Sequence, residues 1–360
     1  MDRRTVSADS HIIEPPDLWV KRIDARYRDR APRIVSEPGG DVFICEDRKP
    51  DRIGTFVTPF FRKEPFAQRF EEGQRGGWDP DARIDDMTVD GIEAEVLYPN
   101  LAMRLYGLQD QGLQAACFRA YNDWLAEYCA AHPKRLYGVA LISLYDIEGA
   151  VLELARANEM GLIGAAIWAD PPEQTTFLDQ RQDAFWAEAQ DRQMPVSLHT
   201  FTGRNREMND VFLARYTCVT QRVQESIADI IFSRVLERFP RLRLVSAEND
   251  VGWVAYLLQR MDYGYLRKGP RHFERFESGL LPSEQFRRNV VCTFMQDAVG
   301  MRTLGFVGSE VLMWASDYPH DDSTWPESQR IIDEMFQGIA DEDRRKIVYS
   351  NAVDLYRMDL

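Results

Sequence analysis

Eight short apolar runs alternate with amphipathic segments along the 360-residue chain. Several runs are apolar almost throughout, which is typical of strands buried on both faces of a parallel sheet. The segments between them repeat apolar residues every three or four positions, which predicts helices. This alternation predicts an α/β fold, either a closed (β/α)8 TIM barrel or a doubly wound open sheet. Because no GxGxxG turn follows the first run, a dinucleotide-binding open sheet is disfavoured and the barrel is preferred.

The predicted strands are residues 5–9, 94–98, 136–144, 163–169, 196–199, 242–247, 289–293 and 311–316. Helices are predicted over residues 111–131, 147–158, 179–192, 219–238, 251–265 and 326–336, with closing helices in 341–360.

Residues 15–80 interrupt the alternation with proline and glycine pairs and many aromatic side chains. Long insertions of this kind usually form functional lids or small subdomains. We therefore expect residues 1–360 to form a single barrel domain, with 15–80 as a long insertion between strands 1 and 2. The insertion would act as a lid over the barrel mouth, as a contact arm between subunits, or as both.

Charge and composition exclude several classes of protein. The net charge is −14 and no basic block is present, which argues against nucleic acid or an anionic membrane surface as a partner. The chain has no run of 18 apolar residues and no apolar segment behind its charged N-terminus, so we expect a cytoplasmic protein. The five cysteines include no CxxC pair, which disfavours a zinc finger or a disulfide framework.

Potential metal ligands stand at the ends of three predicted strands. Asp9 and His11 lie two residues apart, a spacing that places both side chains on one face of a strand. His199 ends the fifth strand and Asp317 follows the eighth. Because a parallel barrel gathers the carboxyl ends of its strands around one point, these four side chains could bind one ion. Each also has a structural alternative, as a packed histidine or a turn and capping residue.

Two imidazoles and two carboxylates suit Zn²⁺, the ion we expect first, and also Mn²⁺. The fourth strand ends in Ala169-Asp170 without a lysine that could bridge two ions as a carbamate, so one divalent ion is expected. Glu248, after the sixth strand, and His320, after the eighth, are candidate acid/base residues together with Asp317. Helix capping near Glu248 and loop stabilisation by His320 are the alternatives.

Loop positions also suggest a substrate site. Arg104 follows the second strand and Arg204 the fifth, where each could bind a carboxylate. An apolar wall could come from Trp168, Phe201, Phe294 and Trp325. Together with the aromatic insertion, these residues predict a largely apolar small-molecule substrate, such as an aromatic or cyclic acid.

The chain resembles the amidohydrolase-related family, in particular the branch of aminocarboxymuconate-semialdehyde decarboxylase and resorcylate-type decarboxylases. The resemblance covers most of the chain. It includes Ala8-Asp-Ser-His-Ile-Ile-Glu-Pro-Pro, Trp78-Asp-Pro-Asp-Ala-Arg83 and Ser316-Asp-Tyr-Pro-His320. It implies a metal-binding (β/α)8 barrel, a homodimer or homotetramer, and metal ligands at Asp9, His11, His199 and Asp317.

Two departures from the family pattern bear on the reaction. The first ligand position is Asp9, where family decarboxylases often carry His or Glu, and Glu248-Asn249 stands where many have a His-Gly pair. Non-oxidative decarboxylation of an aromatic or unsaturated acid and hydrolysis of a lactone, amide or cyclic bond by metal-activated water both fit the ligand set. A third alternative is an inactive barrel that serves as a binding protein.

Overall fold

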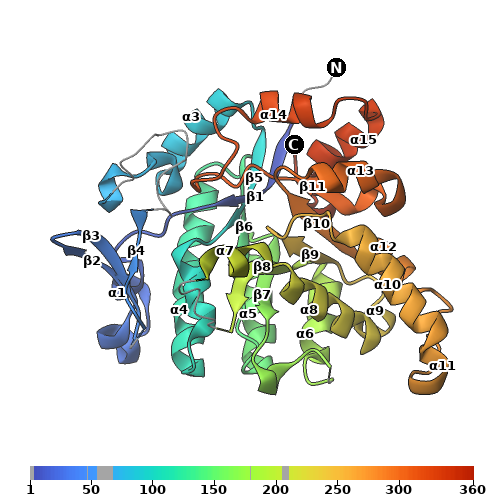
Figure 1. Ribbon diagram of the computed structural model, residues 1–360. Helices are drawn as coiled ribbons and strands as arrows, with labels where there is room; N and C mark the ends of the chain where they lie inside the picture. Colours follow the sequence, from blue (N-terminus) through green and yellow to red (C-terminus); the bar gives the residue numbers. More distant parts are fainter. Residues whose placement is uncertain (1–3, 47, 55–67, 179, 205–210) are drawn as a thin grey trace.

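The computed structural model describes residues 4–46, 48–54, 68–178, 180–204 and 211–360 (Figure 1). Eight parallel strands form one sheet in sequence order, which is the predicted (β/α)8 TIM barrel. They are β1 (Val6–His11), β5 (Ala94–Tyr98), β6 (Leu136–Leu141), β7 (Gly164–Asp170), β8 (Val196–Gly203), β9 (Leu244–Ala247), β10 (Val290–Phe294) and β11 (Leu312–Trp314). All eight predicted strands are therefore present, with ends that differ by a few residues.

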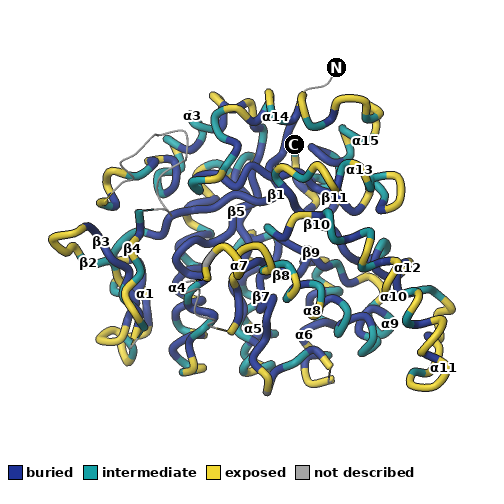
Figure 2. Tube along the Cα trace, viewed as in Figure 1, coloured by how far each residue is buried: buried dark blue, intermediate teal, exposed yellow. Residues whose placement is uncertain are grey.

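The first strand also contacts the segment that follows the last one. The amide of Asp317 donates to the carbonyl of Asp9 at 3.1 Å, and the amide of His11 donates to the carbonyl of Tyr318 at 2.6 Å. The strands lie deep in the molecule, and Figure 2 shows them as its buried centre. Closure of the barrel in this way brings residues from opposite ends of the sequence side by side.

Helices cover the outside of the barrel (Figure 1). The predicted ones are present as α4 (Gln111–Ala130), α5 (Ile147–Glu159), α6 (Asp183–Arg192), α8 (Gln221–Phe232), α10 (Val254–Arg267) and α14 (Ser328–Met335), with α15 (Asp341–Arg345) and α16 (Asn351–Tyr356) near the C-terminus. Further helices are α3 (Pro80–Asp90), α12 (Pro282–Asn289) and α13 (Ala298–Val307).

One predicted helix, residues 219–238, is in fact two. After α8, Arg234 adopts a left-handed backbone with φ of 65°, and α9 (Val235–Arg238) follows it. The Arg234 guanidinium donates to the carbonyls of Glu274 and Arg275 and lies 4.9 Å from the centre of the Phe273 ring. These contacts fix the break in the helix.

The described part of the insertion carries a small antiparallel sheet of β2 (Arg33–Glu37), β3 (Gly40–Ile44) and β4 (Asp51–Arg52). Ahead of it, α1 (Leu18–Arg22) packs against α4, and the Trp19 indole donates to the carbonyl of Cys117 at 3.1 Å. Residues 55–67, with the predicted lid aromatics Phe60, Phe61 and Phe66, lie outside the described residues. The lid therefore stays a prediction.

A buried arginine joins the end of β1 to its surroundings. Arg83 of α3 is fully buried, and it donates to Glu95 of β5 and to the carbonyl of His11, both at 2.5 Å. Its guanidinium also lies 4.7 Å from the centre of the Tyr318 ring. Among the described helices, none is long and apolar enough to cross a membrane.

We expect Arg83→Met to lower the free energy of unfolding by about 3–5 kcal/mol, because it leaves the buried Glu95 carboxylate without its counter-charge. Urea unfolding monitored by circular dichroism measures this change. The control is Arg330→Ala, which removes only exposed ion pairs with Glu327 and Glu334 and should leave the midpoint nearly unchanged. Equal midpoints for Arg83→Met and wild type would contradict this role.

Candidate metal centre

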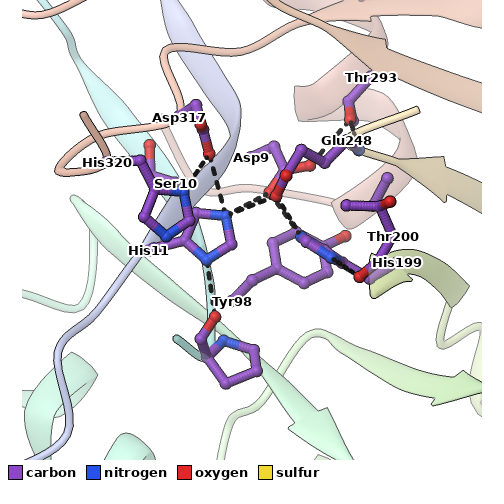
Figure 3. A network of polar contacts seen from close by, with 12 residues as sticks. Asp9, Ser10, His11, Tyr98, His199, Thr200, Glu248, Thr293, Asp317 and His320 are labelled. Atoms are coloured by element: carbon purple, nitrogen blue, oxygen red, sulfur yellow. Dashed lines mark hydrogen bonds and ion pairs between the residues drawn. The ribbon is translucent and has the colours of Figure 1, made fainter. Parts of the chain in front are cut away.

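Six ionisable side chains meet where the strands end (Figure 3). Asp9 and His11 come from β1 and His199 from β8, while Glu248 directly follows β9. Asp317 and His320 lie in the loop after β11. The structure therefore brings together all four predicted ligands and all three predicted acid/base residues.

The ligand-type atoms lie within a few ångströms of one another. His11 Nε2 is 3.1 Å from Asp317 Oδ1, 3.2 Å from Glu248 Oε2 and 3.7 Å from Asp9 Oδ1. His199 Nε2 is 3.5 Å from Asp9 Oδ1 and 3.4 Å from Glu248 Oε2. The atoms thus converge on one small volume.

Both histidines are oriented by the backbone. His11 Nδ1 lies 2.6 Å from the carbonyl oxygen of Pro99, and His199 Nδ1 lies 2.9 Å from that of Thr200. A carbonyl can only accept, so each Nδ1 carries the proton and each Nε2 presents its lone pair to the centre of the cluster. This is the second hydrogen bond that metal-binding histidines usually make.

Several buried atoms of the cluster have no hydrogen-bond partner among the described residues. They are Asp9 Oδ1, Glu248 Oε2 and the Nε2 atoms of His11, His199 and His320. The other oxygen of Asp9, Oδ2, accepts from the Thr293 hydroxyl at 2.9 Å. Buried polar atoms without a hydrogen-bond partner destabilise the fold unless a ligand or ion binds them. A divalent cation fits because the free atoms are the imidazole nitrogens and carboxylate oxygens that such ions prefer.

The backbone is unusual at two of these positions. Glu248 and Asp317 have φ values of 54° and 58°, a left-handed conformation that non-glycine residues seldom adopt. Such conformations concentrate at functional sites, where the surrounding structure enforces them. The amide of Glu248 donates to the Thr293 hydroxyl at 2.8 Å, so Thr293 supports both Asp9 and Glu248.

Burial and mutual charge set the proton affinities of the cluster. Burial raises the pKa of Glu248 well above its usual range, and the charge of Asp317 raises it further. Burial also favours a raised pKa for Asp317, but His320 and His11 reverse this and lower it. Burial opposes the charged form of His11 and His199, yet the neighbouring carboxylates raise the pKa of both imidazoles.

A cavity of about 170 Å³ lies next to the cluster. Its wall includes Thr200 and Asn249, which directly follow His199 and Glu248 in the chain. Arg104, Phe201 and Arg204, three of the predicted substrate-binding residues, line it. Its charged lining consists of Asp170 and five arginines, which are Arg48, Arg104, Arg204, Arg215 and Arg222.

The other three predicted substrate-binding residues do not line this cavity. Trp168 is fully buried, and its indole donates to the carbonyl of Tyr106 at 3.3 Å. Phe294 is buried in the core at the end of β10. The Trp325 indole donates to the carbonyl of Asp86 at 3.0 Å. Of the four rings predicted for an apolar wall, only Phe201 lines this cavity, because packing around the barrel takes up the other three.

Some residues of the site were not predicted. Thr293 lies inside a buried strand, and nothing in the sequence distinguishes its hydroxyl from those of other strand threonines. Arg48, Arg215 and Arg222 come from the insertion and from the segment after β8, and only the fold shows that they share one cavity with Arg104.

Residues 10–358 match the amidohydrolase family, and the chain belongs to it. The chain is 26% identical to the γ-resorcylate decarboxylase of Rhodococcus jostii RHA1 over 298 residues, which cover 78% of this chain and 88% of the relative. This match confirms the predicted resemblance and identifies the chain as an enzyme of that superfamily.

Solved structures share the fold. An amidohydrolase from Mycobacterium avium subsp. paratuberculosis K-10 superimposes with a TM-score of 0.81 at 22% identity, covering 99% of this chain and 100% of that one. A dihydroxybenzoic acid decarboxylase from Polaromonas sp. JS666, solved with manganese and the inhibitor 2-nitroresorcinol, gives a TM-score of 0.68 at 17% identity. That comparison covers 99% of this chain and 98% of the decarboxylase.

Metal affinity should fall as the pH is lowered. The raised pKa values of His11 and His199 mean that protons bind these imidazoles at a higher pH than usual, and a protonated imidazole cannot bind a metal. We expect Mn²⁺ bound in equilibrium dialysis to decrease as the pH is lowered, with the decrease beginning at a higher pH than for an ordinary imidazole. His132→Gln, outside the cluster, is the control and should not shift the curve. A pH-independent affinity would contradict this ligand set.

Proposed function

We propose that this protein is a non-oxidative decarboxylase of aromatic carboxylic acids that uses one divalent metal ion. The observation that carries the proposal is the set of unsatisfied, buried imidazole and carboxylate atoms beside a cavity large enough for a ring. The γ-resorcylate decarboxylase relative and the structure of a dihydroxybenzoic acid decarboxylase support the same reaction.

Asp9, His11, His199 and Asp317 would hold the ion. When bound, a divalent cation would supply positive charge that attracts the acid's carboxylate and holds the substrate beside the cluster. Zn²⁺ and Mn²⁺ both suit these donors, and the manganese in the Polaromonas structure makes Mn²⁺ the ion to test first. Thr293 would keep Asp9 in place through the hydroxyl bond to Oδ2.

Glu248 would supply the proton. In the reaction the ring carbon that carries the carboxylate gains a proton, the bond to that carboxylate breaks, and CO₂ leaves. Burial raises the pKa of Glu248 and so favours its protonated form, whereas His320 and His11 lower the pKa of Asp317 and so favour its carboxylate form. Two carboxyl groups whose pKa values are pushed apart commonly divide into acid and base or ligand. After donation, Glu248 would regain its proton from solvent.

His320 would position Asp317, because its Nδ1 lies 3.0 Å from Asp317 Oδ1. Arg104, Arg204 and Phe201 would contact the substrate from the cavity wall. Residues 15–80 would contribute through Arg48, whose guanidinium donates to the carbonyl of Arg104 at 2.6 Å. This contact supports the insertion as a lid over the site.

We also propose that the enzyme is a cytoplasmic homodimer or homotetramer. Exposed Tyr256, Tyr263 and Leu266 on α10 support self-association, since large exposed apolar side chains often mark subunit contacts. Light scattering after size-exclusion chromatography measures the mass of the assembly against 41.7 kDa for one chain.

With Mn²⁺ or Zn²⁺ added, we expect CO₂ release from a panel of hydroxybenzoates and carboxylated phenols. The readout is loss of ¹³CO₂ from carboxyl-labelled acids, with simultaneous assays of lactones and cyclic amides. Asp317→Asn should lower the rate by at least about 100-fold while leaving the melting temperature close to wild type. Turnover of lactones without CO₂ release from any acid would contradict the proposal and support a hydrolase.

The rate of CO₂ release should depend on pH through Glu248. Because burial raises the pKa of Glu248 and so favours the protonated carboxyl, activity should extend to a higher pH than an ordinary glutamic acid would allow and fall as the pH rises through that pKa. Glu248→Gln should cost about 10²–10⁴-fold in kcat and remove this alkaline decline. Glu248→Asp should restore part of the rate. A Glu248→Gln variant with wild-type activity would remove Glu248 from the reaction.

A further inference from the structure

Glu14 is a fully buried acid close to the metal cluster but outside it. It lies three residues beyond the end of β1. The amide of Ile13 donates to the carbonyl of Gly77 at 2.7 Å. Pro15 follows directly and favours an extended backbone at Glu14, because its ring crowds the preceding residue. The chain on both sides of Glu14 therefore restricts where its side chain can lie.

The carboxyl group of Glu14 binds the start of a 3-10 helix, η4 (Leu101–Gly107), which follows β5. Its Oε1 accepts from the amides of Asn100 and Ala102 at 3.1 and 2.9 Å, and its Oε2 accepts from the amide of Leu101 at 2.9 Å. The first amides of a helix have no partner within the helix, so a side chain that accepts from them stabilises the helix start. Glu14 thus ties the segment after β1 to the segment after β5.

The residue just before these three amides orients a candidate metal ligand. The carbonyl oxygen of Pro99 lies 2.6 Å from His11 Nδ1. Because a carbonyl can only accept, this contact keeps a proton on Nδ1 and leaves Nε2 to face the cluster. A series of contacts therefore runs from Glu14 through the backbone of residues 99–102 to the imidazole of His11.

His199, the other imidazole ligand, is oriented by a separate and local contact. Its Nδ1 lies 2.9 Å from the carbonyl oxygen of Thr200, the next residue in the chain. The Thr202 hydroxyl donates to the carbonyl of His199 at 2.7 Å within the same strand, β8. The two imidazoles are therefore held by different parts of the structure, and a change at Glu14 should affect His11 and spare His199.

We propose that Glu14 is a positioning residue for the metal site, which holds the Pro99 carbonyl against His11 Nδ1 through the amides of residues 100–102. It would thereby set the direction of the His11 imidazole. The inference rests on the proposed function in one respect, since that function makes His11 a metal ligand. Loss of a contact that orients a ligand imidazole typically weakens metal binding by about 10- to 100-fold.

The test replaces Glu14 by glutamine, which keeps the size of the side chain but puts an NH₂ group, unable to accept, in place of one oxygen. The matched control is Asp90→Asn. Asp90 is also buried, and it accepts from the amide and the hydroxyl of Ser328 at 2.9 and 2.5 Å at the start of α14, outside the cluster. Thermal melts measure how far each variant is destabilised.

The first readout is the Nδ1–H proton of each imidazole in the metal-free protein, observed by NMR after labelling with ¹⁵N-histidine. The chain has five histidines, and His11→Gln and His199→Gln assign the two signals. We expect both protons to exchange slowly with solvent in wild type and in Asp90→Asn. In Glu14→Gln the His11 proton should exchange at least about tenfold faster, while that of His199 stays unchanged. An unchanged His11 proton, or an equal change at both histidines, would overturn the inference.

The second readout is the affinity for Mn²⁺ in equilibrium dialysis. It should fall by at least about tenfold in Glu14→Gln and by less than about twofold in Asp90→Asn. Equal losses in the two variants would mean that Glu14 only stabilises the fold. If Glu14→Gln does not fold, hydrogen exchange of wild type decides: Mn²⁺ should slow exchange of the amides of residues 100–102, because coupling between metal and contact is reciprocal. Equal exchange with and without Mn²⁺ would then refute the role.

Failure of the proposed function would be distinct from failure of this inference. A protein that releases CO₂ from none of the acids tested would contradict the proposed reaction but would leave the Nδ1–H exchange rates and the Mn²⁺ affinities as measured. The Nδ1–H readout also requires no bound metal.

Discussion

Four ionisable side chains are buried together where the strands of the barrel end. Asp9, His11, His199 and Asp317 have side chains that are at most 5% exposed. Buried carboxylates and imidazoles without a compensating cation cost several kcal/mol each. The surrounding contacts therefore make sense as parts of one binding site: backbone carbonyls on the Nδ1 atoms, a threonine on Asp9, and left-handed backbone at Glu248 and Asp317.

The same constraint explains how the barrel is closed. The amide of Asp317 bonds to the carbonyl of Asp9, and the amide of His11 bonds to the carbonyl of Tyr318. Ser7 and Ser316, hydrogen-bonded at 3.0 Å, lie on the same two segments. Arg83 donates to the carbonyl of His11, and its guanidinium lies over the ring of Tyr318. Backbone and buried side chains thus fix the two strand ends relative to each other. The same contacts therefore fix the relative positions of the candidate ligands on these two segments.

Sequence patterns were sufficient for the barrel and for the residues of the cluster. Buried parallel strands read as apolar runs, and the polar residues that end them stand out, as Asp9, His199 and Asp317 do. The cavity wall was harder to predict. Trp168 and Phe294 follow the same apolar pattern as the core, and only packing decides that they are buried in it and away from the cavity. Arg215 and Arg222 resemble ordinary surface arginines until the fold brings them to Arg104.

Diffraction from a manganese-soaked crystal would show directly whether the six side chains bind a metal ion. Anomalous difference maps collected above and below the manganese K edge, on crystals soaked in Mn²⁺, would locate the ion without any assumption about the reaction. We expect one strong peak within about 2.0–2.3 Å of Asp9 Oδ1, His11 Nε2, His199 Nε2 and a carboxylate oxygen of Asp317. No peak at the cluster, or a peak held by other residues, would contradict it.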